Sequence, residues 1–355
     1  MTEKTRVAVL YGGRSTEHSV SCVSAGAIMK HLDPEKFEVV PIGITREGTW
    51  TPGDTEGLEI VDGVMPEVKR GTELALSADP SRKGEIRTIS NGSLYAQVDV
   101  IFPILHGPYG EDGTMQGLFE LSGIPYVGPG VLASSVGMDK EFTKKILSAA
   151  GLPVAPEVIV QGRTELTAEE KDSLGLPVFV KPARGGSSIG VSKVSDWAEF
   201  PEAVRIALED DDKILVEPEI VGREVEVGVL QYPDGELIAS VPALLKGIDD
   251  SDEGFYGFET KYLDNVVTAQ IPAPFPEELT AQLREMAIRA FRALNCAGLS
   301  RVDFFVTEEG LYINEVNTLP GFTPISMYPQ VLAASGVDYP TLLEVLIARA
   351  QVRTA

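Results

Sequence analysis

The chain has 355 residues, more than one hydrophobic core ordinarily contains, so two or three domains are expected. Hydrophobic residues make up 43% and charged residues 23%, which excludes disorder over the whole chain, and no apolar run approaches the ~18 residues that cross a membrane. Lys and Arg number 30 against 53 Asp and Glu, and the resulting net charge of −23 argues against nucleic acid as a partner. A phosphate-bearing ligand would therefore need a local cluster of cations, together with metal ions.

The two cysteines, Cys22 and Cys296, lie far apart in apolar segments. This favours buried thiols and argues against a disulfide framework or a zinc site. The polar residues 1–6 lead directly into the first predicted strand, so no signal peptide is expected. Together these features predict a reduced, cytoplasmic protein.

The first third of the chain alternates strand and helix signals. Residues 7–10 form a short apolar run that predicts a strand, and apolar residues recur at helical spacing between 20 and 28. Residues 37–44 and 99–105 are further predicted strands, and the polar stretch 45–97 between them is interpreted as an insertion with some hairpin structure. Strand–helix–strand order implies a parallel sheet covered by helices.

The middle of the chain predicts an α+β block with an antiparallel pair of strands. Its elements, in order, are a helix at 139–150, strands at 177–181 and 191–194, a helix at 197–208 and a strand at 213–217. A third block has a strand at 224–230, a loop at 247–265, a helix at 277–294, two more strands and a last helix at 339–353. The predicted domains are 1–128 (with the insertion at about 45–97), 129–220 and 221–355.

A glycine-rich stretch at 185–190 joins two predicted strands. A Walker A loop instead joins a strand to a helix and carries its lysine at the end, whereas here Lys181 precedes the loop. This order predicts a flap whose amides and hydroxyls fold over phosphates. The alternative is a plain hairpin loop, but a lysine in the apolar setting of residues 178–180 is costly without a partner.

Residues 301–317 predict a β-ribbon with oxygen-bearing side chains on one face. Residues two apart share a strand face, which groups Arg301 with Asp303 and Glu315 with Asn317. A three-residue turn at 308–310 predicts the register pairs Arg301–Asn317, Asp303–Glu315 and Thr307–Leu311. Hard oxygen ligands without His or Cys indicate Mg²⁺ or Mn²⁺. The alternative is a solvated strand face, but an Asp opposite a Glu is repulsive without a cation.

Two further motifs follow predicted strands at the sheet edge where α/β proteins bind ligands. Glu17 follows Gly12-Gly13, and it is either a first-turn acid facing the helix dipole or a carboxylate for a substrate ammonium group. Because the G-x-G-x-x-G pattern is missing, an NAD-dependent oxidoreductase is poorly supported. The second motif is 106–114, in which no catalytic role is assigned to His106. Lys140, Lys181 and Lys261 could supply the local positive charge.

Taken in order, these motifs resemble the D-alanine–D-alanine ligases of the ATP-grasp superfamily. The resemblance runs from about residue 7 to residue 350 and rests on Gly12-Gly13-x-Ser15-x-Glu17, His106-Gly107-x-x-Gly110-Glu111-Asp112-Gly113, Met138-Asp139-Lys140, Lys181-Pro182 with Gly186-Ser187-Ser188-x-Gly190, Lys261-Tyr262, Arg301-x-Asp303 and Glu315-x-Asn317-x-x-Pro320-Gly321. It implies three domains, in which an N-terminal parallel α/β domain precedes two α+β domains that sandwich ATP. It also implies ATP-dependent ligation of two D-alanines through D-alanyl phosphate, for peptidoglycan precursor synthesis, by a homodimer.

The resemblance also implies roles for individual residues. Those implied for ATP are Lys140, Lys181, Ser188 and Lys261 near the phosphates, and Glu217 and Glu224 near adenine and ribose. Those implied for two Mg²⁺ or Mn²⁺ ions are Asp303, Glu315 and Asn317. Those implied for the two D-alanines are Glu17 with Ser187 and Tyr262 at the first ammonium, Arg301 and the Gly321 backbone at the oxyanion, and Ser326 with the Met327 amide at the second carboxylate.

The sequence departs from the family pattern at Pro218-Glu219, where many relatives carry a Lys–aromatic pair after the glutamate. This puts the adenine contacts of that segment in doubt, although not ATP use. Tyr262 favours D-alanine as second substrate, since relatives that make D-alanyl-D-lactate usually lack it. Two alternatives remain, a D-alanine–D-lactate ligase and a nucleotide-binding regulator without turnover. The second would require damaged metal ligands.

Overall fold

The computed structural model describes residues 3–247, 268–323 and 325–352. Its first sheet has the order β3-β2-β1-β7, with β1 parallel to both of its neighbours, as the strand–helix–strand pattern predicts. The bounds are β1 (Thr5–Gly12), α1 (His18–His31), β2 (Phe37–Ile44), β3 (Trp50–Pro52), β7 (Val100–Ile104) and α2 (Thr114–Ser122). The carboxyl ends of β1 and β7 therefore meet at one edge, and the two loop motifs begin there.

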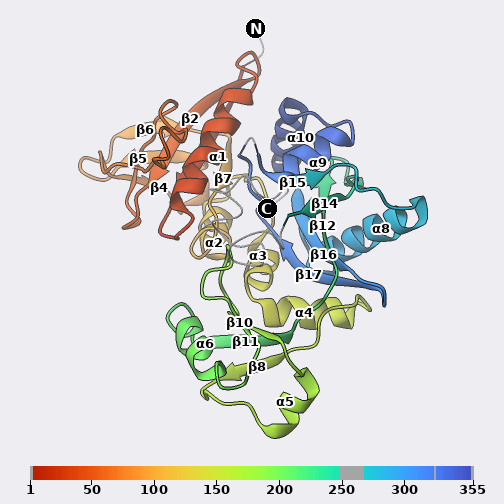
Figure 1. Cartoon of the computed structure of the whole chain (residues 1–355). Helices are drawn as coiled ribbons and strands as arrows, with labels where there is room; N and C mark the ends of the chain where they lie inside the picture. The colour runs from red at the N-terminus through yellow and green to blue at the C-terminus, as the bar shows by residue number, and fades with distance from the viewer. Residues whose placement is uncertain (1–2, 248–267, 324, 353–355) are drawn as a thin grey trace.

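The insertion forms a small antiparallel sheet of its own beside the first (Figure 1). Its strands are β4 (Leu74–Leu76), β5 (Glu85–Thr88) and β6 (Leu94–Gln97), with the short 3₁₀ helix η1 (Pro80–Arg82) between the first two. Strands β5 and β6 pair as a hairpin, which confirms the hairpin structure expected within 45–97. The insertion also supplies β3 to the edge of the first sheet.

The middle of the chain folds around an antiparallel sheet of order β10-β9-β11-β8. The elements are α3 (Val131–Met138), α4 (Lys140–Ala149), β8 (Val158–Gln161), α5 (Ala168–Leu174), β9 (Val178–Pro182), β10 (Ser192–Val194), α6 (Phe200–Ala207) and β11 (Lys213–Pro218). Helix α6 buries Phe200, Ala203, Val204 and Ala207 at the spacing of one helix face. It begins three residues later than predicted, because Pro201 occupies its first turn.

The last third forms an antiparallel sheet of order β15-β14-β12-β16-β17, with β13 paired to β12. The elements are β12 (Arg223–Gln231), β13 (Leu237–Ala239), β14 (Ala243–Lys246), β15 (Thr268–Gln270), α8 (Glu277–Ala293), β16 (Leu299–Val306), β17 (Leu311–Asn317), α9 (Met327–Ala334) and α10 (Tyr339–Gln351). Helix α8 packs on β12, β13, β16 and β17. The domain limits at 128 and 220 stay predictions.

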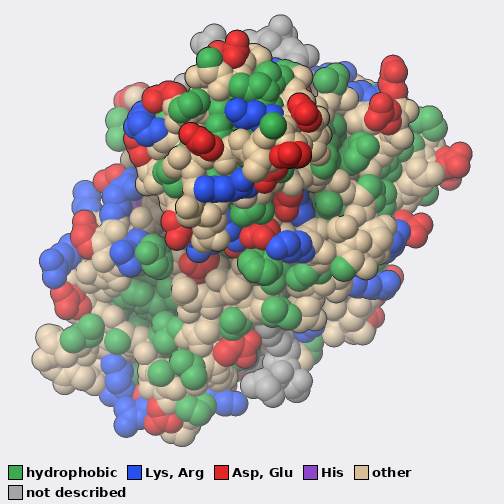
Figure 2. Space-filling model, turned by 90° about the horizontal axis from the view of Figure 1, so that it is seen from below, with side chains coloured by type: hydrophobic (Ala, Val, Ile, Leu, Met, Phe, Trp, Pro, Cys, Tyr) green, Lys and Arg blue, Asp and Glu red, His purple; other side chains and the backbone are tan. Residues whose placement is uncertain are grey.

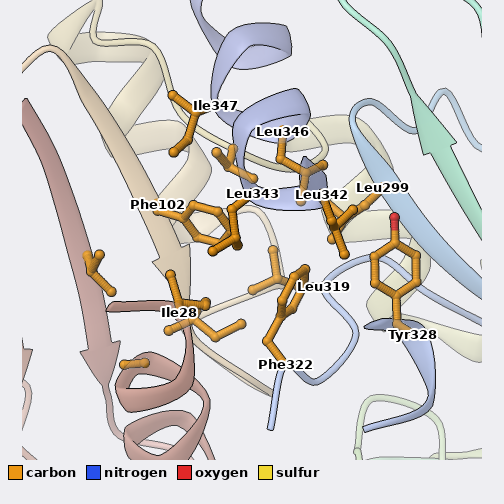
Figure 3. Close-up of a cluster of buried hydrophobic side chains, with 14 of the residues drawn as sticks. Ile28, Phe102, Leu299, Leu319, Phe322, Tyr328, Leu342, Leu343, Leu346 and Ile347 are labelled. Atoms are coloured by element: carbon orange, nitrogen blue, oxygen red, sulfur yellow. The ribbon is translucent and has the colours of Figure 1, made fainter. Parts of the chain in front are cut away.

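One hydrophobic core joins the first sheet to the end of the chain (Figure 3). Phe322, which is fully buried, meets Phe102 of β7 edge-on with ring centroids 5.9 Å apart. Helix α10 contacts both α1 and β7, and its Leu343 and Leu346 lie in the same cluster. The segment that follows β17 is therefore clamped between the first and third sheets, while the middle sheet has a separate core.

Acidic and basic side chains are interspersed over the face that Figure 2 shows. In the described part of the chain, no single helix is both long and apolar enough to cross a membrane. The bent pair α9 and α10 passes only when its two helices are counted together, and both helices bury residues in the core.

The variant Phe322→Ala is expected to lower the free energy of unfolding by about 3 kcal/mol or more, because it opens a cavity where two sheets meet. Urea denaturation followed by circular dichroism measures this change. Leu121→Ala, at a site on α2 that is 66% exposed, is the control and should change stability by no more than about 0.5 kcal/mol. Equal effects of the two variants would contradict the proposed anchoring of the segment.

Candidate active site

Glu17 links the first sheet to the glycine-rich flap of the middle sheet. It lies at the N-cap of α1, is 7% exposed, and makes no capping hydrogen bond with its side chain. Instead, its Oε1 accepts a hydrogen bond of 2.5 Å from Ser187 Oγ. Of the two sequence interpretations, the structure favours a carboxylate aimed into a site over a simple first-turn acid.

The flap holds a backbone conformation that few residues adopt. Ser187 and Ser188 have φ values of +52° and +57°, in the left-handed region that is unfavourable for residues with a side chain. At Gly186, an added Cβ would lie 2.8 Å from Glu17 Oε2. The close approach of flap and carboxylate thus depends on a glycine at this position.

The ribbon of β16 and β17 confirms the predicted pairs Arg301–Asn317 and Asp303–Glu315. The predicted pair Thr307–Leu311 is wrong, because Val306 faces Leu311 and the turn is one residue longer than expected. A β-bulge next to Asp303 absorbs the extra residue and restores the register. Without this bulge, the oxygen-bearing side chains of the two strands would not face one another.

Arg301 is the central cation of this face. Its Nε and Nη2 each donate to a carboxylate oxygen of Asp303 at 2.7 Å, and its Nε lies 3.0 Å from Glu226 Oε2. Burial disfavours the charged guanidinium, but the carboxylates of Asp303 and Glu226 outweigh this and raise the pKa of Arg301 well above its usual value. The guanidinium therefore stays charged and fixed in direction.

Asp303, Glu315 and Asn317 are neighbours in the β16–β17 ribbon. Asn317 Nδ2 donates to Asp303 Oδ2 at 3.0 Å, and Glu315 is the cross-strand partner of Asp303. Within the described residues, no group of three or more His, Cys, Asp or Glu side chains is arranged to hold a metal, so this set consists of two carboxylates and one amide. Its all-oxygen chemistry fits a hard divalent cation such as Mg²⁺ or Mn²⁺.

A cavity of about 510 Å³ lies between the flap and the ribbon, a volume typical of small-molecule sites. One part of its wall is apolar and includes Phe179, Ile189 and Phe304. The polar residues that line it are Lys140, Lys181, Ser187, Ser188, Glu217, Glu219, Arg223, Glu224, Glu226, Lys246, Asp303, Asn314 and Glu315. It thus brings together every described residue that the sequence implicates in ATP binding, along with two of the three implied metal ligands.

Lysines supply much of the positive charge of this cavity, and Arg223 also lines it. Lys140 Nζ donates to the Gly185 carbonyl oxygen at 2.6 Å, and Lys181 forms an ion pair with Glu217. Burial, followed by repulsion from Lys144 and Lys140, lowers the pKa of Lys181 to about 7. A polyanionic ligand would reverse this effect, since its negative charge favours the protonated amine.

A smaller cavity of about 120 Å³ adjoins the first and shares Glu226 and Glu315 with it. Its lining includes the predicted residues Glu17, Ser187, Arg301, Asn317, Gly321 and Ser326. Ser326 Oγ accepts from the Thr323 amide at 3.0 Å, which orients the hydroxyl within the segment anchored by Phe322. The two predicted halves of the site are thus neighbours.

Comparison with known proteins gives the family. The model described as "D-ala D-ala ligase N-terminus" matches residues 6–129, and "D-ala D-ala ligase C-terminus" matches residues 146–348. The chain belongs to the D-alanine–D-alanine ligase family. A D-alanine–D-alanine ligase of Corynebacterium aurimucosum is 66% identical over 356 residues, covering 100% of both chains, and one of a Mycobacterium species is 57% identical, covering 99% of this chain and 97% of the relative.

Solved structures of the family have the same fold. The D-alanine–D-alanine ligase from Coxiella burnetii aligns with a TM-score of 0.85 at 34% identity, covering 99% of this chain and 95% of the other. The VanG D-Ala:D-Ser ligase from Enterococcus faecalis aligns with a TM-score of 0.84 at 36% identity, covering 98% and 100%. The three-domain ATP-grasp architecture implied by the resemblance is thereby confirmed, and the oxidoreductase alternative is wrong.

Glu111 and His106, to which the sequence analysis assigned no role, also line the smaller cavity. Burial, followed by repulsion from Glu17, raises the pKa of Glu111 to about 8, and burial lowers that of His106. His106 Nδ1 lies 3.2 Å from the Leu319 carbonyl oxygen, and within the described chain its buried Nε2 has no hydrogen-bond partner. Their position directly after the predicted strand at 99–105 was the one feature of the sequence that could have indicated a role in the site. Their burial became evident only in the folded structure.

Two of the predicted site residues, Lys261 and Tyr262, lie outside the residues that the structure describes. Most of the predicted loop at 247–265 also lies there. Their roles at the γ-phosphate and at the first ammonium therefore stay predictions.

The variant Arg301→Met is expected to lower the free energy of unfolding at pH 7 by about 3 kcal/mol or more, because Glu226 and Asp303 lose their shared cation. The pKa values of the unpaired acids would rise above those in the unfolded chain. The folded variant would then bind more protons, so part of the loss should be recovered as the pH falls from 7 to 5. Urea titrations at three pH values measure this.

Arg301→Lys is the control, since it keeps a positive charge between the two acids. It should lose less stability than Arg301→Met at pH 7. A loss for Arg301→Met that stays constant between pH 5 and pH 7 would contradict the charge-pairing argument.

Proposed function

We propose that this chain joins two D-alanines into D-alanyl-D-alanine with ATP, supplying peptidoglycan precursor synthesis. Curated relatives that carry the name D-alanine–D-alanine ligase are 57–66% identical over almost the whole chain. The observation that carries the proposal is the pair of adjoining cavities. A lysine-lined cavity suited to phosphates opens beside a smaller one with a carboxylate for an ammonium group and a guanidinium for a carboxylate or oxyanion.

The first chemical step would activate the carboxylate of one D-alanine, because a carboxylate is a poor electrophile. Glu17, held by Ser187, would bind the ammonium group of this D-alanine and aim its carboxylate at the ribbon. Transfer of the γ-phosphoryl group to a carboxylate oxygen gives D-alanyl phosphate and ADP, and it depends on positioning and charge neutralisation. Lys140 and Lys181 would provide the positive charge, with Lys261 the predicted third cation.

The second step would form the peptide bond. The amine of the second D-alanine attacks the carbonyl carbon of D-alanyl phosphate, inorganic phosphate leaves, and the amine gives up a proton. Negative charge develops on the carbonyl oxygen, where Arg301 and the Gly321 amide would stabilise it. Ser326 and the Met327 amide would hold the carboxylate of the second D-alanine, at the start of α9.

We further propose that Asp303, Glu315 and Asn317 hold two Mg²⁺ or Mn²⁺ ions. Such ions would neutralise the charge between the phosphates and the acceptor carboxylate. Asp303 is already oriented by Arg301, and Glu315 lines both cavities, so the set lies where the two substrates would meet. Ser188, Glu217 and Glu224 would contact the rest of the nucleotide.

The second substrate is the main point of specificity to test. The structural neighbour from Enterococcus faecalis is a D-Ala:D-Ser ligase, so D-serine joins D-lactate as an alternative acceptor. Release of ADP and phosphate should be measured with D-alanine alone, and with D-alanine plus D-serine or D-lactate, with the products identified by mass spectrometry. D-alanyl-D-alanine is the expected main product, and no ADP release with D-alanine would overturn the proposal.

The same family membership supports two coarser proposals. We expect the chain to act in the cytoplasm, where ATP is available, and to form a homodimer. Sedimentation equilibrium would test the second expectation, and a monomer at all concentrations would contradict it.

The variant Glu315→Gln is expected to lower kcat by at least about 100-fold, because an uncharged amide is a weaker ligand for a divalent cation. The thermal unfolding midpoint should stay close to that of the unsubstituted protein. The matched control is Glu309→Gln, which makes the same change in the exposed turn between the same two strands. Full activity of Glu315→Gln would remove this residue from the metal site.

Nucleotide affinity should weaken as the pH rises above about 7, because phosphates bind the protonated form of Lys181 and its pKa in the free protein is about 7. Binding must then be accompanied by proton uptake, which costs up to about tenfold in affinity per pH unit until the pKa of the bound state is reached. Calorimetric titration of Mg-ADP between pH 7 and pH 9 measures this. Lys181→Arg, which stays charged, should show a flatter profile, whereas an unchanged pH dependence would contradict the assignment.

A further inference from the structure

Lys144 is a buried lysine that the proposed mechanism does not use. It lies on α4, four residues after Lys140, and its side chain is only 4% exposed. Its Nζ forms an ion pair with Glu217, lies 3.5 Å from Glu157 Oε2, and donates to the Ala155 carbonyl oxygen at 3.3 Å. A buried lysine is costly unless it is paired in this way.

The position of Lys144 places it behind the wall of the larger cavity. Ala155 and Glu217 both line that cavity. Lys144 contacts both of them but is not among the described residues that line the cavity. Lys140, one helical turn earlier, does line the cavity and reaches the flap. Helix α4 thus directs Lys140 into the cavity, and it directs Lys144 to Glu217 from behind the cavity wall.

Glu217 has two cationic partners of different kinds. Lys181 lines the cavity and is available to bind phosphates, but Lys144 is enclosed by protein. When a nucleotide draws Lys181 toward its phosphates, Glu217 loses one of its two partners. Glu217 is only 6% exposed, so it would become a buried, uncompensated carboxylate if Lys144 were absent.

We propose that Lys144 is a positioning residue for recognition of the nucleotide base: it holds the Glu217 carboxylate in place to accept a hydrogen bond from the exocyclic amino group of adenine. This inference rests on the proposed function and adds a residue that sets its nucleotide specificity. Burial lowers the pKa of Lys144 to about 8, although the Glu157 carboxylate opposes this effect, so the amine still carries its charge at neutral pH.

The next residue in the strand limits which groups can contact the base. Pro218 lines the cavity directly after Glu217 and has no backbone N–H to donate to a base. A base beside this residue can therefore receive no hydrogen bond from it, and only acceptors, such as the Glu217 carboxylate and the Pro218 carbonyl oxygen, are available there. Adenine carries an amino group that donates to a carboxylate, whereas hypoxanthine carries a carbonyl oxygen at the same ring position, which a carboxylate repels. ATP and ITP thus differ at the group that Glu217 would read.

The test compares kcat/KM for ATP and for ITP in the full-length protein, together with calorimetric affinities for Mg-ADP and Mg-IDP. Lys144→Met removes the charge and keeps a side chain of similar length. The expected result is a loss on the order of tenfold or more in the ATP-to-ITP ratio, arising mainly from weaker ATP and ADP binding. The matched control is Lys145→Met on the same helix, where the side chain is 59% exposed and should leave the ratio unchanged.

A double-mutant cycle separates positioning from a general loss of structure. Glu217→Gln alone should reduce the ATP-to-ITP ratio, and in that background Lys144→Met should reduce it no further. Lys144→Arg keeps the charge and should retain most of the discrimination even if Lys144→Met folds poorly. If Lys144→Met lowers kcat/KM for both nucleotides equally, or both Lys144 variants leave the ratio intact, the inference is overturned.

Failure of this inference can be told apart from failure of the proposed function. If the unsubstituted protein releases no ADP with ATP and D-alanine, the proposed function falls and this inference falls with it. If it does so and the ATP-to-ITP ratio is unaffected by Lys144→Met and Lys144→Arg, only the role of Lys144 falls.

Discussion

Burial of carboxylates is the constraint on which this structure depends. The chain carries a net charge of −23, yet it places Glu226 and Asp303 in the interior of one site. Arg301 makes this possible, because its guanidinium contacts both acids. The same solution appears at Glu217, which is buried between Lys181 and Lys144. Each of these two groups of acids is therefore built around its own cation, and the directions of Glu226, Asp303 and Glu217 follow from that pairing.

The second requirement is that segments from all three sheets meet. The flap approaches Glu17 only because Gly186 has no side chain and because two serines accept a left-handed backbone. On the other side, Phe322 packs against Phe102 and holds the segment that carries Gly321 and Ser326. Hydrophobic packing thus fixes one wall of the site, while a polar loop with two left-handed serines forms another.

Much of this could be predicted from the sequence, where the pattern is local. The strand and helix periodicities gave most elements, and the alternation in 301–317 placed Arg301 with Asp303 on one face. The turn was one residue longer than predicted, and the β-bulge that corrects it has no evident signal in the sequence. Glu226 was missed because its importance comes from lying opposite Asp303 on a neighbouring strand, 77 residues earlier in the chain. The charge state of Glu111 and His106 depends on burial, which no local pattern reports.

The sequence by itself determined the kinds of chemistry that this protein can host. Oxygen ligands without His or Cys, a glycine-rich flap beside a lysine, and ordered motifs along the whole chain were enough to indicate the family. Only the tertiary structure decided which charges face one another: that Lys144 supports Glu217, that Ser187 contacts Glu17, and that the two cavities adjoin. The physical reason is that the types and spacing of residues are properties of the sequence itself, before the chain folds. Pairing between distant charges, and the pKa values that follow from it, exists only once water has been excluded from around them.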